Sequence, residues 1–311
     1  MTQKMNRRGR DWKKIGWVFG RTLALMSALW SCSGSSDSTT RVYAVATTGM
    51  LADLVRNVAP EGTSVEALIP AGVDPHLYKP AQKDLERLRR AQIVFFNGLL
   101  LEGKMADVLA KLARQKNVVA VGDSLPARLL RPTTAGEYDP HVWFDPKLWS
   151  AAAEVVARAM YRVVADSAVF DRCRKYQAEL AALDAELRAA LDSLPVRVLV
   201  TAHDAFGYFG AAYGVEVVGL QGLSTSTEAG LRDVARLVDL IVERKIKAVF
   251  VESSVPSRAM EAVVQGCAQK GWKVNIGGTL YSDALGAPGT GADTYAGMMR
   301  ANVRTMVAAL R

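Results

Sequence analysis

All three histidines of the chain stand in related sequence contexts. His76 and His141 each follow an Asp-Pro pair and precede an aliphatic and then an aromatic residue, and His203 is followed directly by Asp204. Each is expected between a strand and the next element, where side chains from distant parts of an α/β chain meet. Neutral imidazoles bind borderline divalent metal ions. The shared context therefore favours one metal site. The alternative is three unrelated histidines that form only local hydrogen bonds in loops or in the core.

Short apolar segments alternate with amphipathic segments from residue 42 onward. Strands are expected at 42–47, 64–69, 93–97, 118–121, 197–201, 215–218, 248–251 and 273–276, and helices at 50–58, 82–91, 104–113, 146–165, 169–194, 228–244, 257–270 and 295–310. The alternation predicts an α/β fold with mainly parallel sheets flanked by helices, because a helical crossover places consecutive strands in parallel. The ~280 residues that follow the N-terminal segment fit two domains better than one.

Residues 1–31 have the composition of an export signal sequence. Seven basic residues precede the apolar run from Leu23 to Trp30, which is shorter than the ~20 apolar residues that span a bilayer. Leu29-Trp30-Ser31-Cys32 resembles a bacterial lipobox. We therefore expect a mature chain anchored to the membrane by a lipid on Cys32, with residues 32–41 as a tether. An ordinary cleaved signal and an uncleaved anchor are the alternatives.

The basic charge of the chain lies mostly in this segment. Its seven basic residues and one acidic residue account for six of the eight formal positive charges, so a chain without it carries about +2. No basic stripe with interleaved aromatic residues follows, and we expect no nucleic-acid partner. Cys173 and Cys267 lie in amphipathic segments as small core residues, without Cys-x-x-Cys metal spacing, although a disulfide between them stays open.

Four motifs carry a resemblance to the metal-binding substrate-binding lipoproteins of bacterial zinc and manganese ABC transporters, the TroA-like family. The resemblance covers the chain from about residue 42 to 310. The motifs are Gly72-Val73-Asp74-Pro75-His76-Leu77-Tyr78, Tyr138-Asp139-Pro140-His141-Val142-Trp143-Phe144-Asp145, Val200-Thr201-Ala202-His203-Asp204-Ala205-Phe206-Gly207-Tyr208-Phe209 and Ile276-Gly277-Gly278-Thr279-Leu280-Tyr281-Ser282-Asp283-Ala284.

The resemblance implies one metal ligand from each motif, namely His76, His141, His203 and Asp283. It also implies two α/β lobes, at 42–145 and 167–311, joined by a single long helix that we assign to 146–166. One long helix restricts hinge closure, so metal exchange is expected to use smaller local movements. The implied partner is an ABC transporter permease, which the protein meets on the periplasmic side of the cell envelope, and we expect a monomer.

Three imidazoles and one carboxylate suit Zn²⁺, and also Mn²⁺ or Fe²⁺ if Asp283 binds through both oxygens. Without the resemblance, Asp283 resembles a turn or helix-cap residue. Asp74, Asp139 and Asp204 are candidates to accept the second ring N–H of a histidine, with turn formation as the alternative for the two that precede proline. Glu252 ends a predicted strand and is expected to face the cleft without binding the metal.

Other function classes have less support from the motifs. A zinc enzyme is disfavoured because His-Glu-x-x-His and Gly-x-Ser-x-Gly are absent and four protein ligands leave no position for a reactive water. A surface adhesin is neither supported nor excluded. The resemblance also bears on the metal, because some zinc-dedicated members of the family carry a histidine-rich insertion in the first lobe. No histidine lies between His76 and His141 in this chain, which argues against a scavenger dedicated to zinc. Thr225 and Glu228 have the spacing of a capping box at the start of the helix predicted at 228–244.

Overall fold

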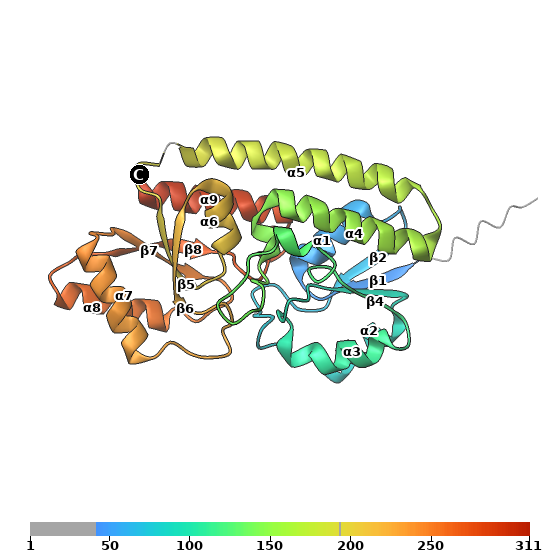
Figure 1. Ribbon diagram of the computed structural model, residues 1–311, viewed down its shortest axis with the longest axis horizontal. Helices are drawn as coiled ribbons and strands as arrows, with labels where there is room; N and C mark the ends of the chain where they lie inside the picture. The colour runs from blue at the N-terminus through green and yellow to red at the C-terminus, as the bar shows by residue number, and fades with distance from the viewer. Residues whose placement is uncertain (1–41, 193) are drawn as a thin grey trace, which may run out of the picture. The chain divides into compact units, whose positions relative to one another are not determined.

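The first lobe is built on a four-stranded parallel sheet in the order β2-β1-β3-β4, in a computed structural model that describes residues 42–192 and 194–311 (Figure 1). Its strands are β1 (Tyr43–Ala46), β2 (Ser64–Ala67), β3 (Ile93–Phe96) and β4 (Asn117–Ala120). Its helices are α1 (Gly49–Val58), α2 (Gln82–Arg90), α3 (Ala106–Ala113) and α4 (Pro146–Val164). The predicted signal sequence and Cys32 lie outside the described residues.

Alternate side chains of these strands pack against helices on the two faces of the sheet. Val45 and Val94 join the apolar cluster that includes residues of α2 and α3, whereas Ala44 and Phe95 join the cluster that includes α1 and α4. Strand residues alternate in direction, so a strand buried on both faces is apolar throughout. This explains the short continuous apolar runs and confirms the predicted parallel sheet.

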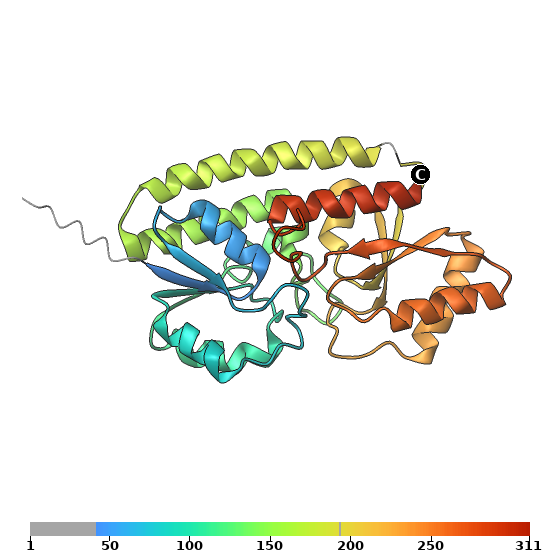
Figure 2. The same cartoon turned by 180° about the vertical axis from the view of Figure 1, so that it is seen from behind.

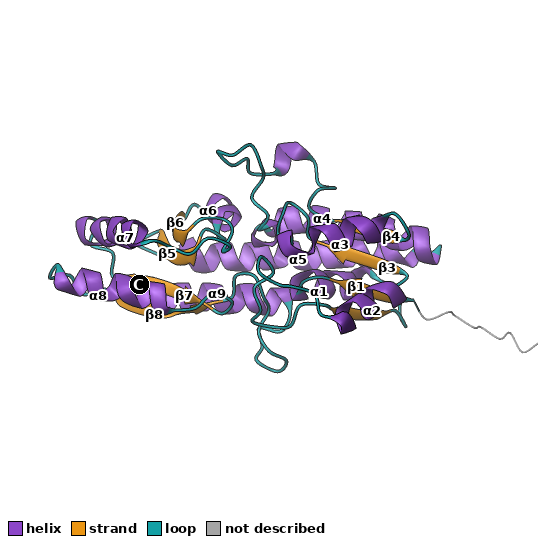
Figure 3. Cartoon of the chain, turned by 90° about the horizontal axis from the view of Figure 1, so that it is seen from below, coloured by secondary structure: helices purple, strands orange, loops and turns teal. Residues whose placement is uncertain are grey.

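The second lobe contains two pairs of parallel strands. The pairs are β5 (Val198–His203) with β6 (Glu216–Gln221), and β7 (Ala248–Glu252) with β8 (Asn275–Leu280), and β5 contacts β7. The helices of this lobe are α6 (Gly207–Tyr213), α7 (Leu231–Glu243), α8 (Arg258–Gln269) and α9 (Tyr295–Leu310). Figure 3 shows loops gathered between the strands of the two lobes, which is where ligands of α/β sheets bind.

The longest described helix contacts both lobes. This helix is α5 (Ala168–Asp192), and it packs against α1 and α4 of the first lobe and α9 of the second (Figure 2). Its buried residues belong to one apolar cluster that extends from α1 and α4 to α9. The helix predicted at 146–166 corresponds to α4, whose contacts lie mainly with α5 and the first lobe, whereas α5 contacts both lobes. The division of the chain at 145 and 166 stays a prediction.

Two local predictions in the second lobe are wrong. Helix α7 begins at Leu231 rather than 228: Gly230 is its N-cap, and its backbone N–H donates to Asp233. Thr225 therefore plays no part in capping this helix. Strand β8 runs on through Gly277 and Gly278 to Leu280. A side chain at either glycine would collide with α9 or Phe250, which explains why both positions are glycine. Glycine is rare in strands, and the pattern of the sequence therefore ended this strand too early.

No helix among the described residues combines the length and the apolar character needed to cross a bilayer.

Candidate metal centre

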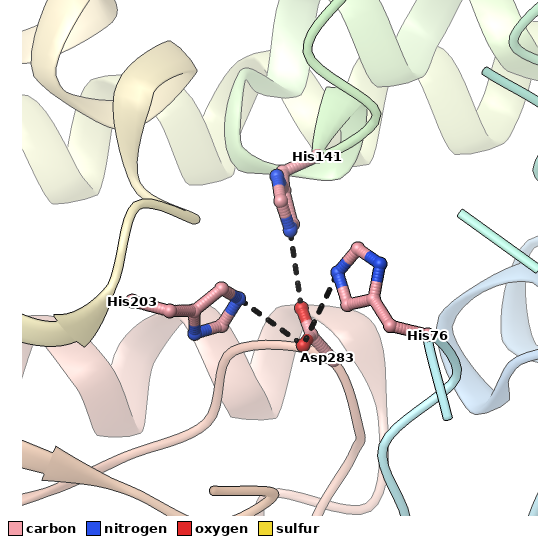
Figure 4. Close-up of side chains that lie close together, drawn as sticks. All are labelled: His76, His141, His203 and Asp283. Carbon is pink, nitrogen blue, oxygen red and sulfur yellow. Dashed lines mark ion pairs between the residues drawn. The ribbon is translucent and has the colours of Figure 1, made fainter. Parts of the chain in front are cut away.

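The four side chains predicted to bind metal lie together in the structure (Figure 4). One potential ligand atom of each of His76, His141, His203 and Asp283 lies within 4.8 Å of the others. The Nε2 atoms of His203 and His141 lie 3.2 and 3.5 Å from the Asp283 carboxylate, and Nε2 of His76 lies 3.9 Å from it. All four residues are buried, with exposed fractions of 4% or less.

The polar atoms at the centre of this cluster have no hydrogen-bond partner. These atoms are Nε2 of the three histidines and both carboxylate oxygens of Asp283. Buried polar atoms without partners are costly, and convergence of several of them indicates that something else binds there. Bond lengths of about 2.0–2.1 Å in a tetrahedral zinc site separate neighbouring ligand atoms by about 3.3 Å. The observed spacing and the nitrogen-rich donor set therefore fit one transition-metal ion.

Each of the four side chains comes from a loop or a strand end. His203 is the last residue of β5, His76 lies in the loop after β2, and Asp283 lies shortly after β8. His141 precedes the 3₁₀ turn Val142–Phe144, which leads into α4 at Pro146. Carboxyl ends of parallel strands from both lobes thus face one another, and two side chains from each lobe meet.

Asp139 orients His141, as predicted. Its Oδ1 atom accepts the backbone N–H of His141 at 3.0 Å and lies 2.8 Å from the ring Nδ1. A carboxylate at Nδ1 keeps the ring proton on that nitrogen, so the lone pair of Nε2 points into the cluster. The ring is thereby fixed in the tautomer that binds metal.

Glu252, rather than Asp204, orients His203. Glu252 Oε1 accepts the backbone N–H of His203 at 2.9 Å, and Oε2 lies 2.5 Å from its Nδ1. Among the described residues, no hydrogen bond or ion pair joins Asp204 to the His203 ring, so the prediction for Asp204 is wrong. The reason is that Glu252 ends β7, which lies beside β5, whereas Asp204 has already left the strand. The expectation that Glu252 faces the cleft without binding the metal agrees with this geometry.

Asp74 supports the His76 loop through the backbone. Its Oδ1 accepts the backbone N–H of His76 at 2.8 Å, as in an Asx turn, and its Oδ2 accepts the hydroxyl of Thr225 at 2.5 Å. The turn alternative therefore describes Asp74 better than contact with the imidazole ring. Thr225 belongs to the second lobe, so this carboxylate also joins the two lobes.

The electrostatics of the cluster act in opposite directions on the pKa values of His76 and His203. Burial lowers the pKa of His76 to about 4. Burial also acts to lower the pKa of His203, but the carboxylates of Glu252 and Asp283 outweigh it and raise that pKa well above its usual range. For Asp283, burial acts to raise the pKa, and the imidazoles, that of His203 foremost, outweigh it and lower the pKa. Both shifts act toward the charged forms of His203 and Asp283, whose Nε2 and carboxylate oxygen lie 3.2 Å apart.

The loop that carries Asp283 is fixed by two contacts that the motifs did not indicate. The indole N–H of Trp143 donates to the Ser282 carbonyl at 3.0 Å, and the Asn302 side chain bonds the backbone N–H and carbonyl of Tyr281 at 2.8 and 2.7 Å. Asn302 is a buried polar residue within the apolar row of α9, which is the sequence signal that would have indicated it.

A buried carboxylate in the first lobe supports the His141 loop. Glu102 accepts hydrogen bonds from the Thr47 hydroxyl and from the backbone N–H groups of Asn97 and Gly98. The Asn97 amide then donates to the Pro140 carbonyl at 2.9 Å, directly before His141. Burial raises the pKa of Glu102, and these hydrogen bonds act in the opposite direction. Sequence reasoning missed Glu102, because it belongs to none of the histidine motifs.

Comparison with a family model identifies the chain over most of its length. The model described as ZnuA, zinc-uptake complex component A, periplasmic, matches residues 44–309. The chain is 45% identical over 284 residues to the manganese-binding lipoprotein MntA of Bacillus subtilis (strain 168), which covers 90% of this chain and 93% of that protein. It is 42% identical over 294 residues to the zinc-binding protein TroA of Treponema pallidum (strain Nichols), covering 93% and 96%.

A solved structure has the same fold. The periplasmic zinc-binding protein TroA from Treponema pallidum matches with a TM-score of 0.84 and 44% sequence identity, over 87% of this chain and 99% of that chain. The match includes both lobes, which confirms the predicted fold class.

Proposed function

We propose, since the chain belongs to the ZnuA family of periplasmic zinc-uptake proteins, that it is the extracytoplasmic substrate-binding protein of an ABC transporter. Its cargo is one divalent transition-metal ion, Zn²⁺ or Mn²⁺, which it passes to the membrane permease. Relatives named for zinc and for manganese support both ions. The observation that carries the proposal is the convergence of three unpaired Nε2 atoms on the Asp283 carboxylate.

The proposed ligands are Nε2 of His76, His141 and His203 and one or both oxygens of Asp283. Four protein ligands complete a tetrahedral shell, so no coordination position is left to activate a water molecule. This closed shell suits storage and transfer of an ion and supports a protein without enzymatic activity. We further propose a monomer held to the membrane at Cys32, with lobes at 42–145 and 167–311.

Titration of the metal-free protein tests the proposal. We expect one Zn²⁺ per chain, and Mn²⁺ at the same site with lower affinity, because the order of divalent affinities places manganese far below zinc at nitrogen-rich sites. Competition between the two ions, followed by calorimetry or by a metal indicator, measures both constants. Metal analysis of protein isolated from its own compartment identifies the cargo. Absence of one-to-one binding of either ion would contradict the proposal.

Metal affinity is expected to fall as the pH falls from about 8 to 5.5. A histidine binds metal only through a neutral nitrogen, so protons and metal compete for the same lone pairs. The pKa of His203 is raised in the metal-free protein, so binding releases its proton, and the dependence extends above the usual imidazole pKa of about 6.5. Each released proton changes the affinity by about tenfold per pH unit. Equal dissociation constants at pH 7.5 and 6 would count against histidine ligands.

A further inference from the structure

We infer that Asp74 and Thr225 form a latch between the lobes that sets the rate at which metal leaves the site. The inference rests on the proposed function and concerns residues outside the four proposed ligands. Asp74 accepts the backbone N–H of His76 through one carboxylate oxygen and the Thr225 hydroxyl through the other. A single side chain thus links the His76 loop of the first lobe to the loop that precedes α7 in the second.

The His141 side of the site is attached to the second lobe at several points. Tyr208 donates its hydroxyl to the Asp139 carbonyl, and Tyr295 donates its hydroxyl to the Trp143 carbonyl, at 3.1 and 2.8 Å. The Trp143 indole N–H donates to Ser282. All three bonds are buried, and they lie beside the apolar cluster shared by the lobes. His141 and Asp283 are therefore held together whether or not the latch is closed.

The His76 side has a weaker attachment. Within residues 42–192 and 194–311, the Thr225 bond is the one hydrogen bond between the 222–230 loop and the first lobe. The other side-chain bonds of this loop are local, such as that between the Ser224 and Ser226 hydroxyls at 2.9 Å. Loss of a single bond therefore releases the His76 loop from this segment without disturbing the shared core.

There is space for the released loop to move. Asp74, Leu77 and Thr225 line a cavity of about 450 Å³ between the His76 loop and helices α7 and α8. Leu77 and Leu231 at this cavity are 46% and 90% exposed, so little packing covers its edge. Metal release then begins with rupture of the Thr225–Asp74 bond. The His76 loop moves away, and the ion is left with the three ligands that remain fixed.

Replacement of Thr225 with valine removes the hydroxyl and keeps the shape of the side chain. We expect Zn²⁺ to dissociate from the Thr225→Val protein about tenfold faster or more, the factor typical for loss of a hydrogen bond to a charged group. The rate is measured by stopped-flow mixing of the Zn²⁺-loaded protein with excess chelator. Thr225→Ser restores the hydroxyl and is expected to restore a slow rate. Ser226→Ala removes a neighbouring hydroxyl that bonds within its own loop, and it serves as the matched control.

A second variant tests the other half of the latch. Asp74→Asn keeps an acceptor for the His76 N–H, but it replaces the charge-assisted bond with Thr225 by a weaker neutral one in which the NH₂ group donates to the hydroxyl. Dissociation is therefore expected to accelerate here too, by less than in Thr225→Val. In the Asp74→Asn background, Thr225→Val should accelerate dissociation by a smaller factor than in the wild type, because the two changes weaken the same bond. Fully additive effects of the two changes, or a wild-type dissociation rate in Thr225→Val, would contradict the latch. Neither result would contradict the proposed metal binding. Failure of the unmodified protein to bind Zn²⁺ would instead overturn the proposed function, and the latch with it.

Discussion

Replacement of His141 with alanine is expected to weaken metal binding by well over a hundredfold. Loss of a residue that only orients a ligand typically costs 10–100-fold in affinity, and His141 is itself a proposed ligand at the centre of the cluster. Three ligands remain, and the fourth position opens to water. Calorimetric titration with Zn²⁺, or competition with a chelator of known affinity, measures the loss.

The metal-free His141→Ala protein is expected to stay folded. Asp139 loses the ring Nδ1 partner but still accepts the backbone N–H of residue 141, so the expected destabilisation is about 1–3 kcal/mol. Phe144→Leu is the matched control, because it alters a fully buried neighbour that is not a proposed ligand. A His141→Ala protein that binds Zn²⁺ like the wild type would contradict the role of His141. So would a His141→Ala protein that unfolds, if Phe144→Leu weakens Zn²⁺ binding to the same extent.

Replacement of Glu252 with glutamine is expected to weaken metal binding about 10–100-fold although it changes only one atom of the side chain. The two carboxylate oxygens contact two different groups of His203: Oε1 the backbone N–H, and Oε2 the ring Nδ1. In glutamine the oxygen must face the backbone N–H, so the NH₂ group faces Nδ1. The ring then carries its proton on Nε2, and that nitrogen no longer binds metal.

Asp139→Asn is the matched comparison for this prediction. Here one oxygen, Oδ1, contacts both the backbone N–H and the ring Nδ1 of His141. An asparagine can keep its oxygen at that point and turn its NH₂ group away, so His141 retains its tautomer. We expect an affinity within about tenfold of the wild type. NMR of the imidazole nitrogens reports the tautomers directly, and equal losses in the two variants would contradict the argument.

The strand–helix alternation was sufficient to predict the fold class. The Asp-Pro-His context of His76 and His141, and the expected position of all three histidines after strands, were sufficient to predict that His76, His141 and His203 form one site. Asp283 depended on the resemblance, because an isolated aspartate after tyrosine and serine has no pattern of its own. Glu252 was placed in the cleft, but its contact with His203 follows from the pairing of β5 beside β7, which local sequence does not encode. Thr225 was misassigned as a helix cap for the same reason: its partner Asp74 lies in the other lobe.

The contacts of α5 with both lobes were not predictable from the sequence. The amphipathic patterns indicated two long helices in succession, α4 and α5, and the first was assigned as the connecting helix. Whether a helix contacts the second lobe depends on which other helices pack against its row of apolar side chains. For α5 that includes α9, which forms at the far end of the sequence, so the contact is tertiary and leaves no local signal.

The apolar cluster shared by α1, α4, α5 and α9 makes the two lobes mechanically one body, and residues 41–311 accordingly form one compact unit. A wide opening of the kind seen in hinged receptors would expose this cluster to water, at a cost of roughly 25 cal/mol for each Å² of apolar surface. The permease therefore meets nearly the same outline with or without cargo. The permease must therefore distinguish the metal-loaded from the metal-free protein by local differences at the surface, such as the position of a single loop, rather than by overall dimensions.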